Sequence, residues 1–470
     1  MKTILQCAAF LFVTAQFTCA LASESDYVVV APASMKADAA WQAVVDGLAK
    51  KHGAPIVTYE KNVAEVREKL AALAPRYVGF VARPSEAGSQ YVIDIHRMLR
   101  KLNDDPYTDA VWGIITGRTA DDALKIVTQT EPLVIRKGAA GTGIPLDKFV
   151  EARAYSEGEA GAVQIKTADG KIEKVKGPQD STKALVDVFN DFKTDLFFTS
   201  GHASERNWQI GYSYANGYFV CKKGVLYGMD MQKKLFKIDS PNPKVYLPLG
   251  NCLMGHVADE ESMALAFMGS GGVRQMCGYV VPTWFGYGGW GIQDYFFVQP
   301  GRFSFAESVY LNNQALLNRL EREFPAQAHA DIDTLGMEHD RNWFGKTAAQ
   351  LGITGNVSGK DKDLMGLLYD RDVVAFYGDP KWDARMTPGE APWTQTLTEK
   401  DGTFTFELTA TKSAKPGRPP AAMLARRIGK TQIVEGKEFE PVVGAWFVML
   451  PKVTEIEAGK TIRVVFKEAK

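Results

Sequence analysis

A histidine and a cysteine each stand just past the end of an apolar run. His202 follows the run 196–200 with one glycine between them, and Cys252 follows the run 245–249 with a Gly-Asn pair between them. A thiol attacks a carbonyl carbon when a base takes its proton and backbone N–H groups stabilise the oxyanion that forms. The two residues are therefore candidates for the base and the nucleophile of an acyl-transfer enzyme.

The same residues also fit less specific roles. A histidine at a strand end is commonly structural, and a cysteine in an apolar context is commonly a small core residue. His256 lies four residues after Cys252, so on a helix the two would share a face and could bind a metal with Asp259 or Glu260. Catalytic zinc needs about three protein ligands. No second Cys/His pair is present, so the spacing favours thiol chemistry over a metal site.

Apolar runs alternate with amphipathic stretches through the first part of the chain. Strands are predicted at 27–31, 55–58, 77–82 and 110–116, and helices at 38–51, 63–73, 93–102 and 120–128. This alternation is typical of βαβ units in a parallel sheet. The α/β class is therefore expected for this part of the chain.

The segment that carries the candidate site continues this pattern. An inserted β-hairpin is predicted at 151–177, a helix at 181–192, and strands at 196–200, 245–249 and 273–281. Functional side chains gather at the carboxyl ends of parallel strands. The 50 residues from His202 to Cys252 allow one crossover between neighbouring strands, which would bring both side chains to one groove.

Helical periodicity stops near residue 380. Short strands separated by Gly, Pro and Lys are predicted at 403–408, 432–434, 445–450 and 461–466. Such a pattern is typical of a small β-sandwich. A domain boundary is expected between residues 388 and 392.

The charge balance and the N-terminus indicate where the protein acts. Lys plus Arg and Asp plus Glu both number 55, so neither a nucleic-acid partner nor an anionic membrane surface is indicated. No later run reaches the ~18 apolar residues that a membrane span needs. Residues 1–22, with an apolar stretch at 4–17 and a final Ala-Leu-Ala, predict a cleaved signal peptide. A lipid anchor on Cys19 is a less favoured alternative, and a secreted or periplasmic protein is expected.

Three cysteines remain after removal of the predicted signal: Cys221, Cys252 and Cys277. An odd number in an exported protein leaves at least one thiol free or paired between chains. Two arrangements are open. Either all three thiols are reduced, or Cys221 and Cys277 form a disulfide and Cys252 stays free.

The segments around the two candidates resemble the gingipain family of caspase-like cysteine peptidases. The family pattern of an apolar block before the His and another before the Cys matches LFFTSGHAS (196–204) and VYLPLGNCLMGH (245–256). Further family segments resemble, in the same order, 107–126, 263–284 and 373–382. The resemblance covers most of 27–470. It implies an α/β caspase-like parallel-sheet three-layer sandwich with an N-terminal α/β subdomain, followed by an immunoglobulin-like β-sandwich.

The resemblance also implies roles for individual residues. Cys252 would be the nucleophile and His202 the base, with the backbone amides of Cys252 and Ala203 as oxyanion donors. The family usually has glycine after the histidine, whereas this chain has Gly201 before it and Ala203 after it. A positive φ at Ala203 would therefore strain the loop. Asp109 would orient the imidazole, unless it is a solvated residue at a strand start.

Substrate and ion binding are less well defined. Gly201 and Trp284 would contact the substrate, although Trp284 also fits a packed aromatic loop. Asp294 is the nearest acidic residue that could recognise a basic substrate side chain. Family members can carry structural calcium, but no loop here has EF-hand form. No organic cofactor is implied.

Together these features predict a signal peptide (1–22), an N-terminal α/β subdomain (23–150), a catalytic subdomain (151–388) and a β-sandwich (389–470). The predicted activity is hydrolysis of peptide or protein substrates through a thioester. A secreted homologue that only binds a partner is one alternative. A periplasmic ligand-binding protein is another, but it gives no role to His202 and Cys252. No long pro-segment is visible before the first predicted strand.

Overall fold

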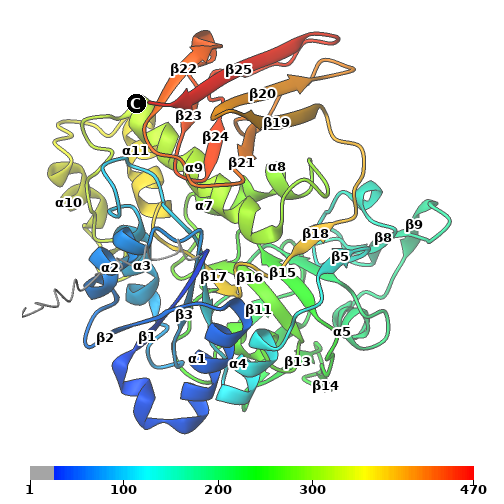
Figure 1. Ribbon diagram of the computed structural model, residues 1–470. Coiled ribbons are helices and arrows are strands. Elements are labelled where there is room, and N and C mark those ends of the chain that lie inside the picture. The colour runs from blue at the N-terminus through cyan, green and yellow to red at the C-terminus, as the bar shows by residue number, and fades with distance from the viewer. Residues whose placement is uncertain (1–25, 470) are drawn as a thin grey trace, which may run out of the picture.

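The computed structural model describes residues 26–469 (Figure 1), so the predicted signal peptide lies outside the described residues. Its main feature is a twelve-stranded sheet. The order is β2 (Ile56–Tyr59), β1 (Tyr27–Pro32), β3 (Tyr77–Val81), β4 (Val111–Ile115), β17 (Val374–Gly378), β16 (Val273–Tyr279), β15 (Lys244–Pro248), β10 (Leu196–Thr199), β6 (Lys137–Ala140), β7 (Glu151–Tyr155), β8 (Ala162–Lys166) and β9 (Ile172–Lys176). The predicted α/β class is confirmed.

The sheet consists of two parallel halves that run in opposite directions. Strands β2 to β17 are parallel to one another, as are β16 to β7, and the halves meet at the antiparallel pair β16–β17. The carboxyl ends of β10 and β15 therefore share an edge with the amino end of β4. Strand β6 precedes residue 150 but pairs with β10, so the predicted boundary at 150 cuts through the second half.

Helices cover both faces of the sheet. They are α1 (Ala39–His52), α2 (Arg67–Leu73), α3 (Ser89–Leu99), α4 (Ala120–Val127), α5 (Thr182–Asn190), α6 (Met263–Met268), α7 (Tyr287–Trp290), α8 (Ile292–Phe296), α9 (Phe305–Glu323), α10 (Trp343–Gln350) and α11 (Gly359–Asp370). In β1, Val28 and Val30 enter one core while Val29 enters another. This alternation explains the continuous apolar run, because a strand buried on both faces has no solvent-facing residues.

The connection from β10 to β15 is itself a small sheet. It contains the antiparallel strands β11 (Asn207–Gln209), β12 (Tyr218–Lys222), β13 (Val225–Met229) and β14 (Leu235–Lys237). Helices α5 and α6 contact this sheet. The predicted hairpin at 151–177 is present as β8 and β9, which extend the edge of the main sheet rather than forming a separate insert.

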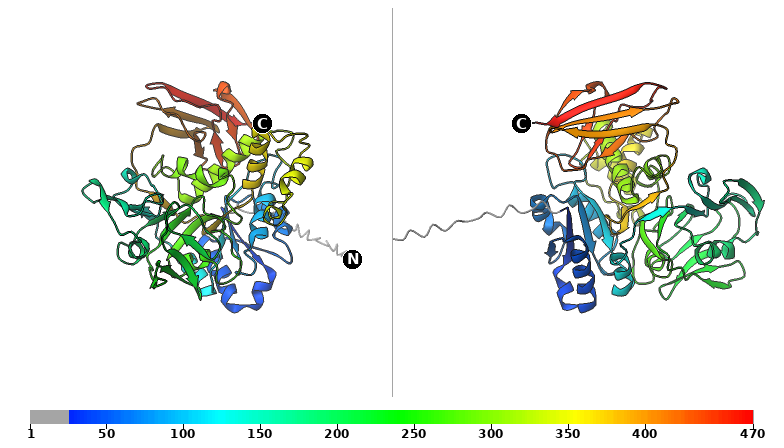
Figure 2. Two further views of the ribbon diagram at one scale, coloured as in Figure 1. Left: turned by 180° about the vertical axis from the view of Figure 1, so that it is seen from behind. Right: turned by 45° about the vertical axis from the view of Figure 1, so that its right-hand side comes forward.

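A β-sandwich follows the α/β part. One sheet contains β19 (Thr394–Lys400), β20 (Thr403–Thr409), β25 (Thr461–Glu468) and β22 (Thr431–Glu435), and the other β21 (Ala421–Met423), β24 (Phe447–Met449) and β23 (Val442–Val443). Figure 2 shows it at one end of the molecule, with the N-terminal strands and the β8–β9 hairpin on opposite sides below it. The Phe447 ring packs edge-on against Tyr107, with 5.3 Å between ring centroids, so the sandwich rests on the α/β part.

Two predictions about bonding and membranes are resolved by the structure. Cys221, Cys252 and Cys277 are all free thiols, so the alternative of a Cys221–Cys277 disulfide is wrong. Within residues 26–469, no helix has the length and apolar character needed to cross a bilayer.

Candidate active site

The histidine and the cysteine follow two neighbouring strands. Strands β10 and β15 are parallel, and Thr199 pairs with Pro248 at their carboxyl ends. His202 lies three residues beyond Thr199, and Cys252 lies four residues beyond Pro248. The predicted adjacency of the two strand ends is therefore present in the structure.

A buried asparagine connects the two loops. Asn251 is fully buried, and its side-chain Nδ2–H donates to the carbonyl of Gly201 across 2.9 Å. Its Oδ1 accepts from the Thr199 hydroxyl at 2.6 Å, and that hydroxyl also lies 2.9 Å from the Tyr246 hydroxyl. A fully satisfied buried polar network of this kind fixes the groups that it joins. The residue before Cys252 thus holds the residue before His202.

The backbone around Cys252 is sharply turned. Gly250 has a φ of +82° and Leu253 a φ of +58°. A left-handed conformation is unusual for leucine, and strained residues of this kind cluster at functional sites. The Thr283 backbone N–H donates to the Cys252 Sγ at 3.3 Å. The half-buried thiol therefore has a defined place at the sheet edge.

Two backbone amides, one in each of the loops that follow β10 and β15, are available as donors. Among the described residues, neither the N–H of Cys252 nor that of Ala203 has a hydrogen-bond acceptor in the protein. Ala203 is not among the residues with positive φ, whereas Gly201 has a φ of +89°. The expected strain at Ala203 is therefore absent, because the glycine before the histidine makes the left-handed turn instead.

The imidazole of His202 is exposed, and its ring stacks on the Tyr212 ring. The centroids are 4.9 Å apart and the planes differ by 24°. No hydrogen bond to the ring nitrogens occurs within residues 26–469. Both nitrogens are thus free for proton transfer at the open edge of the sheet.

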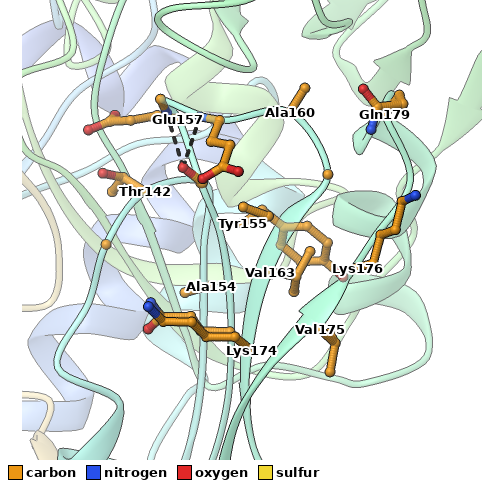
Figure 3. Close-up of a pocket in the computed structure, with 17 residues that line it drawn as sticks. Thr142, Ala154, Tyr155, Glu157, Ala160, Val163, Lys174, Val175, Lys176 and Gln179 are labelled. Carbon is orange, nitrogen blue, oxygen red and sulfur yellow. Dashed lines mark hydrogen bonds between the residues drawn. The ribbon is translucent and has the colours of Figure 1, made fainter.

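The acidic residue beside the His202 loop is Glu157, which follows β7. Its carboxylate accepts a short hydrogen bond from the Ser200 hydroxyl, and its backbone carbonyl accepts from the Tyr212 N–H at 2.6 Å. A cavity of about 770 Å³ lies beside it (Figure 3), between the loop after β7 and the β8–β9 hairpin. Thr142, Glu157 and Lys174 are among its lining residues, but His202 and Cys252 are not. The cavity therefore borders the site only through Glu157.

The prediction that Asp109 orients His202 is wrong. Asp109 precedes β4, and three strands separate β4 from β10, which at ~4.8 Å per step places the two strand ends about 19 Å apart. The carboxylate is buried and accepts from the Asn103 side chain. Burial, and then the nearby Asp105, raise its pKa to about 8. Asp109 is a structural residue under the β-sandwich.

The structure gives no support to the metal alternative. His256 Nδ1 lies 2.6 Å from the Ser89 hydroxyl, which itself donates to the Val280 carbonyl, so Nδ1 carries the proton. Burial lowers the pKa of His256. Asp259 accepts two hydrogen bonds from the Arg206 guanidinium, one on each carboxylate oxygen. No cluster of three or more His, Cys, Asp or Glu side chains suited to a metal occurs in the described part of the chain.

Aromatic side chains border Cys252 on the side of β16. Trp284 follows Thr283 and is 63% exposed, so it is not part of a packed aromatic loop. The indole of Trp290 lies against Gly250, where an added Cβ would come within 2.8 Å of Cζ2. Asp294 faces Gly417 instead, where an added Cβ would meet its carboxylate. Trp284 is thus open to solvent, and Asp294 is directed toward the β-sandwich.

Sequence reasoning missed three residues of this site: Asn251, Glu157 and Tyr212. Asn251 stands in the Gly-Asn-Cys string, but nothing local reveals that its amide reaches across to Gly201. Glu157 follows a strand end, the position that carries function in parallel sheets, so recognising β7 would have found it. Tyr212 lies in an irregular loop with no sequence signal.

Comparisons with known proteins show a distant likeness. No protein-family model and no curated protein matches the chain. A crystal structure of the Arg specific cysteine proteinase gingipain R aligns with 95% of this chain and 99% of its own, at 10% identity and a TM-score of 0.41. A structure described as a protease covers 95% of both chains, at 12% identity and a TM-score of 0.38.

A complex of the RgpB pro- and mature domains from Porphyromonas gingivalis aligns with 93% of this chain and 98% of its own, at 10% identity and a TM-score of 0.36. At these identities and TM-scores the likeness assigns no role to any residue.

Proposed function

We propose that the protein is an exported cysteine endopeptidase that uses Cys252 as nucleophile and His202 as base. The observation that carries the proposal is the Asn251 bond to the Gly201 carbonyl, because it ties the loop of the thiol to the loop of the imidazole. The predicted signal peptide at 1–22 supports export. The proposed chemistry uses no organic cofactor.

The reaction proceeds in two halves. His202 takes the proton of the Cys252 thiol, and the thiolate attacks the carbonyl carbon of the peptide bond. The tetrahedral intermediate collapses when the imidazolium gives its proton to the leaving amine, which departs and leaves a thioester. Water, deprotonated by His202, then attacks the thioester. The acid product leaves and Cys252 is protonated again.

The backbone supports this chemistry at the oxyanion. The unbonded N–H groups of Cys252 and Ala203 are suited to hold the negative oxygen of both tetrahedral intermediates. Removing one such donor typically lowers kcat by about 10²–10³-fold. Because both donors are backbone amides, side-chain substitution leaves them in place.

Thiol alkylation and peptide hydrolysis together test the proposal. We expect iodoacetamide to modify Cys252 much faster than a free cysteine at neutral pH. Cys252→Ala should abolish rapid labelling and all cleavage of a fluorogenic peptide library, and His202→Ala should slow both by about 10²–10⁴-fold. Cys221→Ala is the matched control, since Cys221 is free but lies in β12, and it should change neither.

One outcome would favour the alternative of a non-catalytic binding protein. Labelling of Cys252 at the rate of a free thiol, together with no hydrolysis of any library member, would contradict a peptidase. The fold would then serve recognition alone.

A further inference from the structure

We infer that Tyr212 is a positioning residue that orients the imidazole of His202 by ring stacking, in place of a carboxylate. The inference rests on the proposed function, since it assigns a role in the reaction of Cys252 and His202. Tyr212 lies in the irregular loop between β11 and β12, outside the two loops that carry His202 and Cys252.

The first support is the isolation of the imidazole. His202 is exposed, and in the part of the chain that the structure describes its ring nitrogens have no hydrogen-bond partner. The Tyr212 ring, 4.9 Å away and tilted by 24°, is the aromatic contact of His202. A histidine base usually takes its orientation from a hydrogen bond to one nitrogen. Here the face of the ring is held and both nitrogens stay free.

The second support is the way in which Tyr212 is fixed. The Glu157 carbonyl accepts from the N–H of Tyr212 at 2.6 Å and from that of Ser213 at 3.1 Å. The Glu157 carboxylate accepts from Ser200, two residues before His202. One residue therefore anchors both the loop that carries the phenol and the loop that carries the imidazole.

The third support is the geometry around Gly201. A Cβ built on Gly201 would lie 3.6 Å from Tyr212 Cδ2 and 3.9 Å from the Glu157 carboxylate. Tyr212 thus lies over the left-handed turn as well as over the imidazole.

The position of the stack suits a working base. Stacking restrains the imidazole through its face and leaves the ring nitrogens, which lie at its edge, without a partner among the described residues. Tyr212 is 57% exposed, so its replacement removes little buried surface. Loss of function in a Tyr212 variant would therefore report on His202 rather than on folding.

The test measures alkylation of Cys252 by iodoacetamide at two pH values in the full-length protein. Near pH 6.5 a free thiol is almost wholly protonated, so labelling depends on proton removal by the imidazole, whereas near pH 8.5 solvent alone supplies thiolate. We expect Tyr212→Ala and Tyr212→Leu to slow labelling about tenfold at the lower pH and less than twofold at the higher pH. Tyr212→Phe keeps the stack and should stay within about twofold of wild type at both.

Peptide hydrolysis and a surface control complete the test. In Tyr212→Ala, kcat should fall about tenfold while KM stays within about twofold, because an orienting residue acts on the reaction more than on binding. Phe344→Ala, which removes a 47% exposed aromatic ring from α10, should leave labelling unchanged.

Two results would overturn the inference, and they differ. A fast-labelling wild type with an equally fast Tyr212→Ala at both pH values would remove the role of Tyr212 and leave the peptidase proposal intact. A wild type that labels no faster than free cysteine would remove both.

Discussion

The side chain of Asn251 donates to the carbonyl of Gly201 across 2.9 Å, so the residue before the proposed nucleophile holds the residue before the proposed base. Neither Asn251 nor Gly201 takes part in the proposed bond making. Their contact sets the separation of two loops that belong to different strands. The bond therefore links the loop of Cys252 to the loop of His202 at one residue from each.

Replacement of Asn251 by alanine is expected to reduce both activity and stability. The half-buried Gly201 carbonyl loses its donor and the buried Thr199 hydroxyl loses an acceptor, which costs about 1–3 kcal/mol in free energy of unfolding. The loops separate, and kcat/KM should fall by about 10–100-fold. Urea unfolding and peptide hydrolysis measure the two effects. Asn318→Ala is the control, since Asn318 in α9 is also buried and its side chain donates to the Tyr107 hydroxyl. It should lose stability and retain kcat/KM; an equal loss of activity there would contradict a specific role for Asn251.

Gly250→Ala is expected to disturb the loop of Cys252 through two effects. The φ of +82° disfavours any side chain, and the new Cβ would lie 2.8 Å from the Trp290 ring. Gly402→Ala tests the backbone effect alone, because Gly402 has a φ of +74° and a Cβ built on it has nothing within 4 Å. We expect Gly402→Ala to lose about 1–2 kcal/mol from left-handed backbone alone. Gly250→Ala should lose more and should also slow labelling of Cys252. Equal losses in the two variants would show that the Trp290 contact is unimportant.

Asp109→Asn is expected to stabilise the protein near pH 7 without changing activity. Burial raises the pKa of Asp109 to about 8, so its stabilising contribution is present at low pH and is lost as pH rises from about 4 toward 8. Each unit of pKa shift corresponds to about 1.4 kcal/mol. In Asp109→Asn the side-chain oxygen can still accept from Asn103. Because the amide does not ionise, the variant does not lose stability as the pH rises. Thermal unfolding at pH 4 and pH 7 should show a gain only at the higher pH, with unchanged hydrolysis. A drop in kcat would restore a catalytic role to Asp109.

Glu157 substitutions are expected to separate hydrogen bonding from charge. Glu157→Gln keeps an oxygen that accepts from Ser200, and kcat should remain within about threefold of wild type. Glu157→Ala leaves Ser200 without this partner, and kcat should fall about tenfold. Steady-state hydrolysis distinguishes the two variants. If Gln and Ala lower kcat equally, the negative charge of Glu157 matters more than its hydrogen bond.

The sequence predicted the strands well where burial is continuous. β1, β10 and β15 are buried on both faces of the sheet, so their apolar runs are unbroken and the sequence shows where each strand ends. The pairing of β10 with β15 brings the strand ends before His202 and Cys252 to one edge of the sheet. Strand β6, with the sequence Lys-Gly-Ala-Ala, has no β-branched run and carries no such signal. The predicted boundary at residue 150 therefore follows a strand that pairs with β10.

Local sequence patterns do not predict the relative direction of the strands. Antiparallel pairing of β16 with β17 is a long-range choice, made by segments about a hundred residues apart. The expectation for Asp109 assumed that an acidic residue near a strand of the N-terminal half could reach His202. The ends of β4 and β10 lie about 19 Å apart across the sheet, which excludes a contact between Asp109 and His202. Tyr212 and Glu157 meet through loop backbone, which has no periodicity to read.

The insertion of β17 between β4 and β16 has a consequence for biogenesis. Residues 374–378 are the last strand of the twelve-stranded sheet to leave the ribosome, yet they lie near its centre. The two halves can therefore join only after nearly four-fifths of the chain has been made, and such late, distant pairing is slow. Until then β4 and β16 are open edges that invite aggregation. A fragment ending at residue 372 should need a chaperone to remain in solution.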